Sequence, residues 1–265
     1  MSWTLLASGL SDVLSLALVI RIAMLGLHSA YRIFCAFLLF EVVSESFFLI
    51  ERSTALDKLL DYRVTWLVVQ TISWVLSIWM VYQLLRMILA KLPGVLRFSQ
   101  RVLKIAFPLS VVVALLTAGP EYIASGAASK AEPINFLVSV AVILSRMVAT
   151  ICALTLLATL CFILWFPVRM PRNLAVFSIG LALYFAAKTF SLLFLNFWSH
   201  ESRPLVSNVV TFILCFCFLY WLAFLNQSGE SVEVTLGHSW GREKQDLLVR
   251  DLEHLNAVLG RATRH

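Results

Sequence analysis

Five ionisable side chains lie inside stretches of the sequence that are otherwise apolar. They are Asp12, Glu41, Glu45, Arg146 and Lys188. Ionisable groups are rare in membrane-spanning helices, where they usually face the interior of the helix bundle and mark paths for ligands, ions or protons. Carboxyl and ammonium groups in such a place can pair with a charged ligand, hold a cation or exchange a proton. These five residues are therefore candidates for a ligand, ion or proton site.

Two uncharged polar residues extend this candidate site. Gln70 shares a helix face with Ser73 and Ser77, and Tyr184 lies one helical turn before Lys188, because offsets of three, four and seven residues return to the same face. The same polar side chains also have a structural interpretation. Serine and threonine hold membrane helices together at about 0.6 kcal/mol each, and acids and bases neutralise one another as structural pairs. The sequence leaves both interpretations open.

The acids and the bases are separated along the chain. The acids Asp12, Glu41 and Glu45 occupy the first two apolar stretches, whereas Arg146 and Lys188 lie in the fifth and sixth. An unpaired charge at that depth costs at least about 2.5 kcal/mol. We therefore expect a buried salt bridge between Glu41 or Glu45 and Lys188, and a second pair between Arg146 and Asp12 or the remaining glutamate. Three acids against two bases leave one carboxyl over, which we expect to be a proton-sensitive switch or part of a substrate site.

The elements that position these side chains follow from the composition. The chain has 265 residues, of which 60% are hydrophobic and 14% charged, and its mean hydropathy is +0.88. Soluble domains are about 45–50% apolar and about 25% charged, so lipid must surround most of this chain. This composition excludes a soluble enzyme, a nucleic-acid-binding domain, a disordered tail and a secreted disulfide scaffold. The net charge of +6 implies no nucleic-acid partner, because most basic residues lie in loops between apolar stretches.

Seven stretches are long enough to cross a bilayer, which needs about 20 mostly apolar residues. They are 3–27, 31–50, 63–85, 103–122, 134–166, 173–197 and 204–225. We therefore predict an all-α, multi-pass bundle of seven transmembrane helices within residues 1–227. One set of loops, with the tail, carries thirteen Lys and Arg residues, against five in the other set. Because basic residues favour the cytoplasmic side, we expect the N-terminus outside, the C-terminus in the cytoplasm, and the plasma or inner membrane as the location.

Residues 228–265 form a polar tail that contains one apolar seam. The seam consists of Leu248, Leu252, Leu255 and Leu259. This spacing predicts an amphipathic helix over 242–259. Two interpretations of the helix remain open, namely docking on the protein's own inner loops or on the membrane surface, and contact with a second copy or a protein partner. The basic segment 91–101 is expected to lie along the lipid headgroups or to be an ordinary loop.

No motif for catalysis, metal binding or phosphate binding occurs in the sequence. It has no HExxH, GxSxG, GxGxxG or Walker pattern, and its five histidines lie outside the apolar stretches or at their ends. We expect no cofactor and no bound metal. The first interpretation is a sensor, a scaffold or an assembly subunit in the bilayer. A secondary transporter or an ion or proton pathway using the same charges is the alternative, and a membrane enzyme is a third class that no residue indicates.

Overall fold

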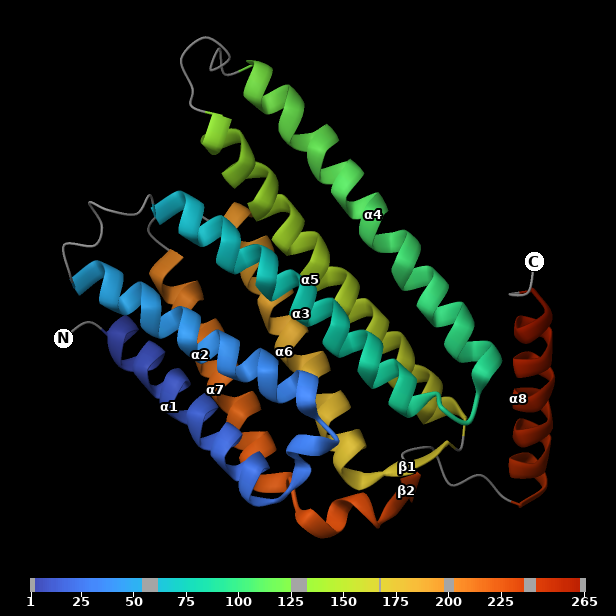
Figure 1. Cartoon of the computed structure of the whole chain (residues 1–265). Coiled ribbons are helices and arrows are strands. Elements are labelled where there is room, and N and C mark those ends of the chain that lie inside the picture. The colour runs from blue at the N-terminus through green and yellow to red at the C-terminus, as the bar shows by residue number, and fades with distance from the viewer. Residues whose placement is uncertain are drawn as a thin grey trace.

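The computed structural model describes residues 3–53, 62–124, 133–166, 168–197, 203–235 and 242–262. Over these ranges the chain is all-α apart from two short strands (Figure 1). The eight α-helices there are α1 (Trp3–Met24), α2 (Arg32–Ser53), α3 (Tyr62–Ile88), α4 (Pro93–Ala124), α5 (Pro133–Trp165), α6 (Arg172–Phe197), α7 (Arg203–Phe224) and α8 (Arg242–Ala262). The strands are β1 (Arg169–Pro171) and β2 (Glu233–Thr235), and the short 3₁₀ turns are η1 (Leu27–Ser29) and η5 (Gln227–Glu230).

Each of the seven predicted spans overlaps one of the helices α1 to α7. Four stretches in the described residues are long and apolar enough to cross a membrane, which indicates a membrane protein. They are Tyr62–Ile88, Pro93–Leu116, Ile134–Trp165 and Arg172–Ser191. The apolar part of α7, Asn208–Phe224, is shorter. The count of seven crossings and the orientation of the chain therefore remain predictions.

Helix α4 differs from the sequence prediction because it begins well before residue 103. It starts at Pro93 and continues past Pro108 as one helix. Proline suits the first helical position, where its missing N–H group has no partner to lose. Most of the segment 91–101 therefore forms the first turns of α4 and is not an ordinary loop, and its position at the lipid headgroups stays a prediction.

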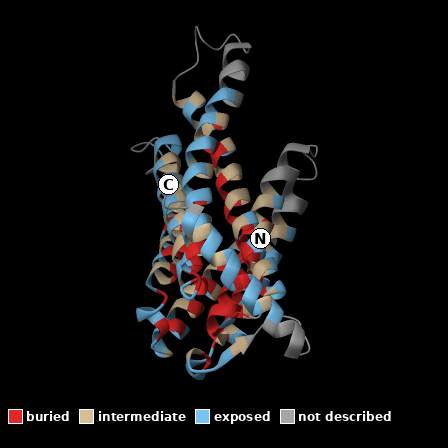
Figure 2. Cartoon of the chain, turned by 90° about the vertical axis from the view of Figure 1, so that its right-hand side faces the viewer, coloured by how far each residue is buried: buried red, intermediate tan, exposed pale blue. Residues whose placement is uncertain are grey.

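Six of the long helices form a closed ring, and α4 lies outside it. The order of helices around the ring is α1, α2, α3, α5, α6 and α7. Each helix contacts the next one in this order, and α7 contacts α1. Helix α4 packs against α5 on the periphery (Figure 1). We call the end of the bundle that carries β1, β2 and η5 the tail end, and the opposite end the far end. Buried residues gather in the half nearer the tail end (Figure 2).

A two-stranded sheet lies at the tail end, and α8 stands beside α4 at the side of the bundle (Figure 1). Strand β1, just before α6, pairs antiparallel with β2, which follows α7. Helix α8 confirms the predicted amphipathic helix, and it packs against α4 of its own chain. Within the seam, Leu252 is buried, Leu259 packs partly against the core, and Leu255 is 39% exposed.

One asparagine joins α8 to the start of α4. The Asn256 side-chain oxygen accepts hydrogen bonds from the backbone N–H groups of Gly94, at 2.6 Å, and Val95, at 3.3 Å. The first N–H groups of a helix have no partner inside that helix, so this oxygen caps α4. Gly94 has no room for a Cβ atom, because the Asn256 backbone and side chain occupy that space. Docking on the protein's own helices is therefore the state of the seam in this structure.

Candidate functional site

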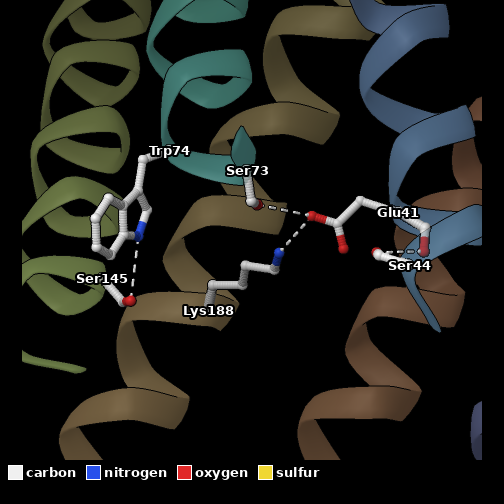
Figure 3. Close-up of polar contacts among 6 residues, drawn as sticks. All are labelled: Glu41, Ser44, Ser73, Trp74, Ser145 and Lys188. Carbon is white, nitrogen blue, oxygen red and sulfur yellow. Dashed lines mark hydrogen bonds and ion pairs between the residues drawn. The ribbon is translucent and has the colours of Figure 1, made fainter. Parts of the chain in front are cut away.

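An ion pair in the middle of the ring joins α2 to α6. The Lys188 ammonium nitrogen lies 3.1 Å from the Glu41 Oε1 atom, and the Ser73 hydroxyl of α3 donates to the same oxygen at 3.2 Å (Figure 3). The prediction that Glu41 or Glu45 pairs with Lys188 is confirmed, with Glu41 as the partner. The adjacent residue of α3, Trp74, donates to the Ser145 hydroxyl of α5 at 3.1 Å. Helices α2, α3 and α6 thus meet at the ion pair, and the Trp74–Ser145 hydrogen bond connects α5 to α3 beside it.

The expectation of a buried salt bridge is not supported. The side chains of Lys188 and Glu41 are 31% and 20% exposed, and no charged residue is among the buried residues that the structure describes. The physical reason is that both side chains border cavities in the bundle. The pair is therefore half-buried and faces space that water or a ligand can occupy.

Aromatic rings hold the lysine in place. The Lys188 nitrogen lies 4.8 Å from the centre of the Tyr184 ring and 5.9 Å from that of Phe37. A cation within about 6 Å of a ring face is attracted by the ring's quadrupole. Tyr184 lies one turn before Lys188 on α6, so the helix itself places the ring beside the ammonium group. The candidate Tyr184 thus supports the position of Lys188.

Two small cavities flank the ion pair. The first, about 160 Å³, lies between α2 and α3 and is lined by Phe40, Glu41, Ser44, Glu45, Phe48, Trp66, Val69, Gln70, Ser73 and Lys188. The second, about 100 Å³, lies among α1, α2, α6 and α7 and is lined by Ser11, Asp12, Ser15, Phe37, Leu38, Glu41, Val42, Glu45, Tyr184, Lys188, Leu214 and Phe218. We call Asp12, Glu41, Glu45 and Lys188 the charged centre. Since a water molecule takes about 30 Å³ of liquid volume, the two cavities have room for a few waters or a small ion only.

The second cavity brings three carboxyl groups together with a single ammonium group. Asp12, Glu41, Glu45 and Lys188 all line it. The Ser15 hydroxyl lines it too, is 4% exposed, and has no hydrogen-bond partner. A buried hydroxyl left without a partner costs about 1–3 kcal/mol. An occupant of this cavity can satisfy the hydroxyl and, as a proton or a cation, can balance the excess of carboxyl groups.

Two of the carboxyl groups, those of Asp12 and Glu45, are hydrogen-bonded to each other at the second cavity. In the part of the chain that the structure describes, no three His, Cys, Asp or Glu side chains are placed to bind one metal ion.

The second predicted ion pair, between Arg146 and Asp12 or Glu45, is wrong. The Arg146 Nε atom is buried without a hydrogen-bond partner, and no ion pair of Arg146 is present within the described residues. The ring explains why, because α1 packs between α2 and α7, whereas α5 packs against α3, α4 and α6. Asp12 instead shares the second cavity with Glu45, and Gln70 lines the first. Of the seven candidates, only Arg146 lies outside these two cavities.

Four aromatic residues that the sequence analysis did not single out join the candidate Tyr184 and close the ring on the tail-end side of the charged centre. Phe34, Phe37, Phe177, Tyr184 and Trp221 are each at most 5% exposed, and we call them the aromatic layer. Ring centres lie 4.7 Å apart for Phe34 and Phe177, 5.0 Å for Phe34 and Trp221, and 5.8 Å for Phe37 and Tyr184. On α2 and α6 this layer lies on the tail-end side of Glu41 and Lys188. The sequence has 19 phenylalanines. Only their packing in the structure distinguishes Phe34, Phe37 and Phe177 from the phenylalanines that face lipid.

A second group that sequence reasoning missed lies at the tail end. Asn173, with no exposed surface, donates to the Asn226 carbonyl at 2.8 Å and to the Glu230 carboxylate at 3.2 Å. The Tyr31 hydroxyl also donates to Glu230, at 2.7 Å. We call these four residues the polar hub. Asn173, a polar residue close to the start of an apolar helix, is the one sequence feature that could have indicated it.

Comparisons of the chain with models of known families, with curated proteins and with solved structures found no match. The interpretation of the site therefore depends on its own geometry.

Proposed function

We propose that this protein is a seven-span membrane sensor whose charged centre takes up a proton or a small cation from the far end. The observation that carries the proposal is the position of the Glu41–Lys188 pair. It lies between two small cavities lined by further carboxyl groups, and the aromatic layer closes the ring on the tail-end side. The charge bias of the loops predicts that the far end faces outside. The partner of the transmembrane part is the lipid bilayer.

Access from one end favours a sensor over a secondary transporter. Alternating access requires that a central site opens to each end in turn. In this structure the first cavity extends along α2 and α3 from Glu41 towards Phe48 and Trp66, which lie on the far-end side. Below the pair, Phe37 and Tyr184 are packed edge to face. A proton or ion pathway through the same charges is the alternative, and it requires these rings to separate.

Helix α6 connects the charged centre to the tail end. Lys188 lies toward the far-end part of α6 and Asn173 near its start, about 22 Å apart at 1.5 Å per residue. If Glu41 takes up a proton or binds a cation, its attraction for Lys188 weakens, and α6 can shift by about 1–2 Å, as helices in switching proteins do. Asn173 holds η5 through Asn226 and Glu230, and the chain continues from there through β2 to α8. We propose that α8 is the output element, whose seam becomes available to a second copy or another protein.

The test uses Glu41→Gln, which imitates a protonated carboxyl. In lipid nanodiscs, we expect the protection of α8 against hydrogen exchange, corrected for the intrinsic exchange rate at each pH, to decrease in the wild-type protein as the pH falls from about 8 to about 4. Glu41→Gln should show the low protection of α8 at both ends of this range. Glu253→Gln, at an exposed position of α8, is the matched control and should behave as wild type. Protection of α8 that changes neither with pH nor in Glu41→Gln would contradict the proposal.

A further inference from the structure

A third cavity, separate from the charged centre, lies at the tail end between α2, α3 and α6. Its volume is about 420 Å³, and its polar residues include Arg32, Gln83 and Arg86. Arg32 is the first residue of α2, and Arg86 lies in the last turn of α3. Two guanidinium groups from different helices thus border one space, and it has the size of a small-molecule site, about 300–1,000 Å³.

Neither of these two arginines is paired with an acid among the residues that the structure describes. No Asp or Glu lines the cavity, and neither Arg32 nor Arg86 forms an ion pair within the described part of the chain. Both residues are exposed, so their guanidinium groups can turn towards a ligand. The polar side of the cavity is therefore strongly cationic, and it suits an anion.

The rest of the cavity is apolar. Its floor includes Met80, Phe177 and Leu181, each at most 3% exposed. Trp79 borders it on the surface of α3 and is 52% exposed. The cavity thus offers positive charge at the helix ends and an apolar surface that begins one to two turns further into the bundle. A ligand that matches both parts is an anionic amphiphile.

We infer that this cavity binds the phosphate-bearing headgroup of an anionic phospholipid, with the start of an acyl chain against Trp79. The planar guanidinium group presents paired N–H donors that match phosphate oxygens, and two of them can hold one phosphate from both sides. Basic residues at the ends of membrane helices lie at the depth of lipid headgroups, and tryptophan favours the same interface. The inference does not depend on the sensor proposal, because it needs only that the tail end lies at a membrane surface.

The test compares lipid binding to the delipidated full chain in detergent, measured by native mass spectrometry. We expect phosphatidylglycerol to bind more tightly than phosphatidylcholine, and Arg32→Gln with Arg86→Gln to weaken phosphatidylglycerol binding about 30-fold, since each basic residue near an anionic lipid contributes about a fivefold factor. Arg32→Lys with Arg86→Lys keeps both charges but removes the paired N–H donors, so it should bind phosphatidylglycerol more weakly than the wild-type protein and more tightly than the glutamine variant. The matched control is Arg97→Gln with Lys104→Gln, which removes two exposed positive charges of α4 that do not line the cavity.

The outcomes distinguish the lipid from other sources of phosphate. Selective loss of phosphatidylglycerol binding in the Arg32/Arg86 variant, with the control unchanged, supports the inference. Equal binding of both lipids by the wild-type protein, or equal loss in variant and control, overturns it. Inorganic phosphate that displaces phosphatidylglycerol at millimolar concentration also overturns it, because the cavity would then be a site for free phosphate.

Discussion

Replacing Lys188 by glutamate should lower the melting temperature of the protein in mild detergent by about 5–10 °C. The change removes the partner of Glu41 and places a fourth carboxyl beside the cavity that Asp12 and Glu45 already line. An unpaired charge in the middle of a membrane helix costs about 2.5–3.5 kcal/mol, and in a protein of this size about 1 kcal/mol shifts the melting temperature by 2–4 °C. Adding Glu41→Lys restores an opposite-charge pair, so the double variant should recover at least half of the loss.

The matched control for this experiment is a second ion pair in the same chain. Lys91 and Glu233 lie 3.3 Å apart, but their side chains are 67% and 54% exposed. An exposed pair contributes about 0.2–1 kcal/mol, so Lys91→Glu should change the melting temperature little. The pairing account is contradicted if Lys188→Glu is no more damaging than Lys91→Glu, or if neither Glu41→Lys nor Glu45→Lys recovers any stability.

A single methyl group at Gly180 should destabilise the aromatic layer. Gly180 lies on α6 directly against the Trp221 indole of α7, and a Cβ atom there would overlap the indole ring. Trp221 is 1% exposed and cannot move aside without disturbing Phe34 and Tyr184. Overpacking of this kind costs about 1–3 kcal/mol, which exceeds the roughly 0.8–1 kcal/mol that alanine gains over glycine inside a helix. We therefore expect Gly180→Ala to lower the melting temperature.

Gly9→Ala is the control for Gly180→Ala, because Gly9 lies on α1 and no atom comes within 4 Å of the Cβ position there. It should leave the melting temperature unchanged or raise it slightly through helix propensity. A smaller ring makes room for the added methyl group, so Gly180→Ala combined with Trp221→Phe should be more stable than Gly180→Ala alone. Equal melting temperatures for the two glycine variants would show that Gly180 and Trp221 are not in close contact.

The sequence predicts well those features that depend on local pattern. The lengths of the apolar stretches predict the long helices, and the leucine spacing predicts α8. The free-energy cost of an unpaired charge in a membrane predicts that Lys188 has an acidic partner. The predicted ion pair of Arg146 is wrong for a different reason. Which helices become neighbours is decided by the packing of the whole ring, and nothing in the local pattern near Arg146 shows that α5 lies away from α1.

The degree of burial and the shape of the site also exceed what the sequence can predict. Glu41 and Lys188 are ionisable at any position, but whether their surroundings are packed or hollow depends on the side chains of several other helices. The aromatic layer illustrates the same limit. Phe34 and Phe177 are distant in sequence, and both lie in apolar stretches where lipid-facing and core-facing rings look alike.

The central claim is that the charged centre can be reached from the far end only, and labelling of a single cysteine tests it most directly. The five native cysteines are first replaced. In one variant, Gln70→Cys places a single thiol in the cavity between α2 and α3. In a second variant, Lys91→Cys places it at an exposed tail-end position and reports which side of the vesicle membrane that end faces. Silver ion, a thiol-binding cation small enough for this cavity, should modify the Gln70→Cys protein when added on the far-end side and leave it unmodified when added on the tail-end side, where Lys91→Cys reacts. Modification of Gln70→Cys from the tail-end side as well would mean that the aromatic layer opens, and it would contradict the sensor account in favour of a pathway through the protein.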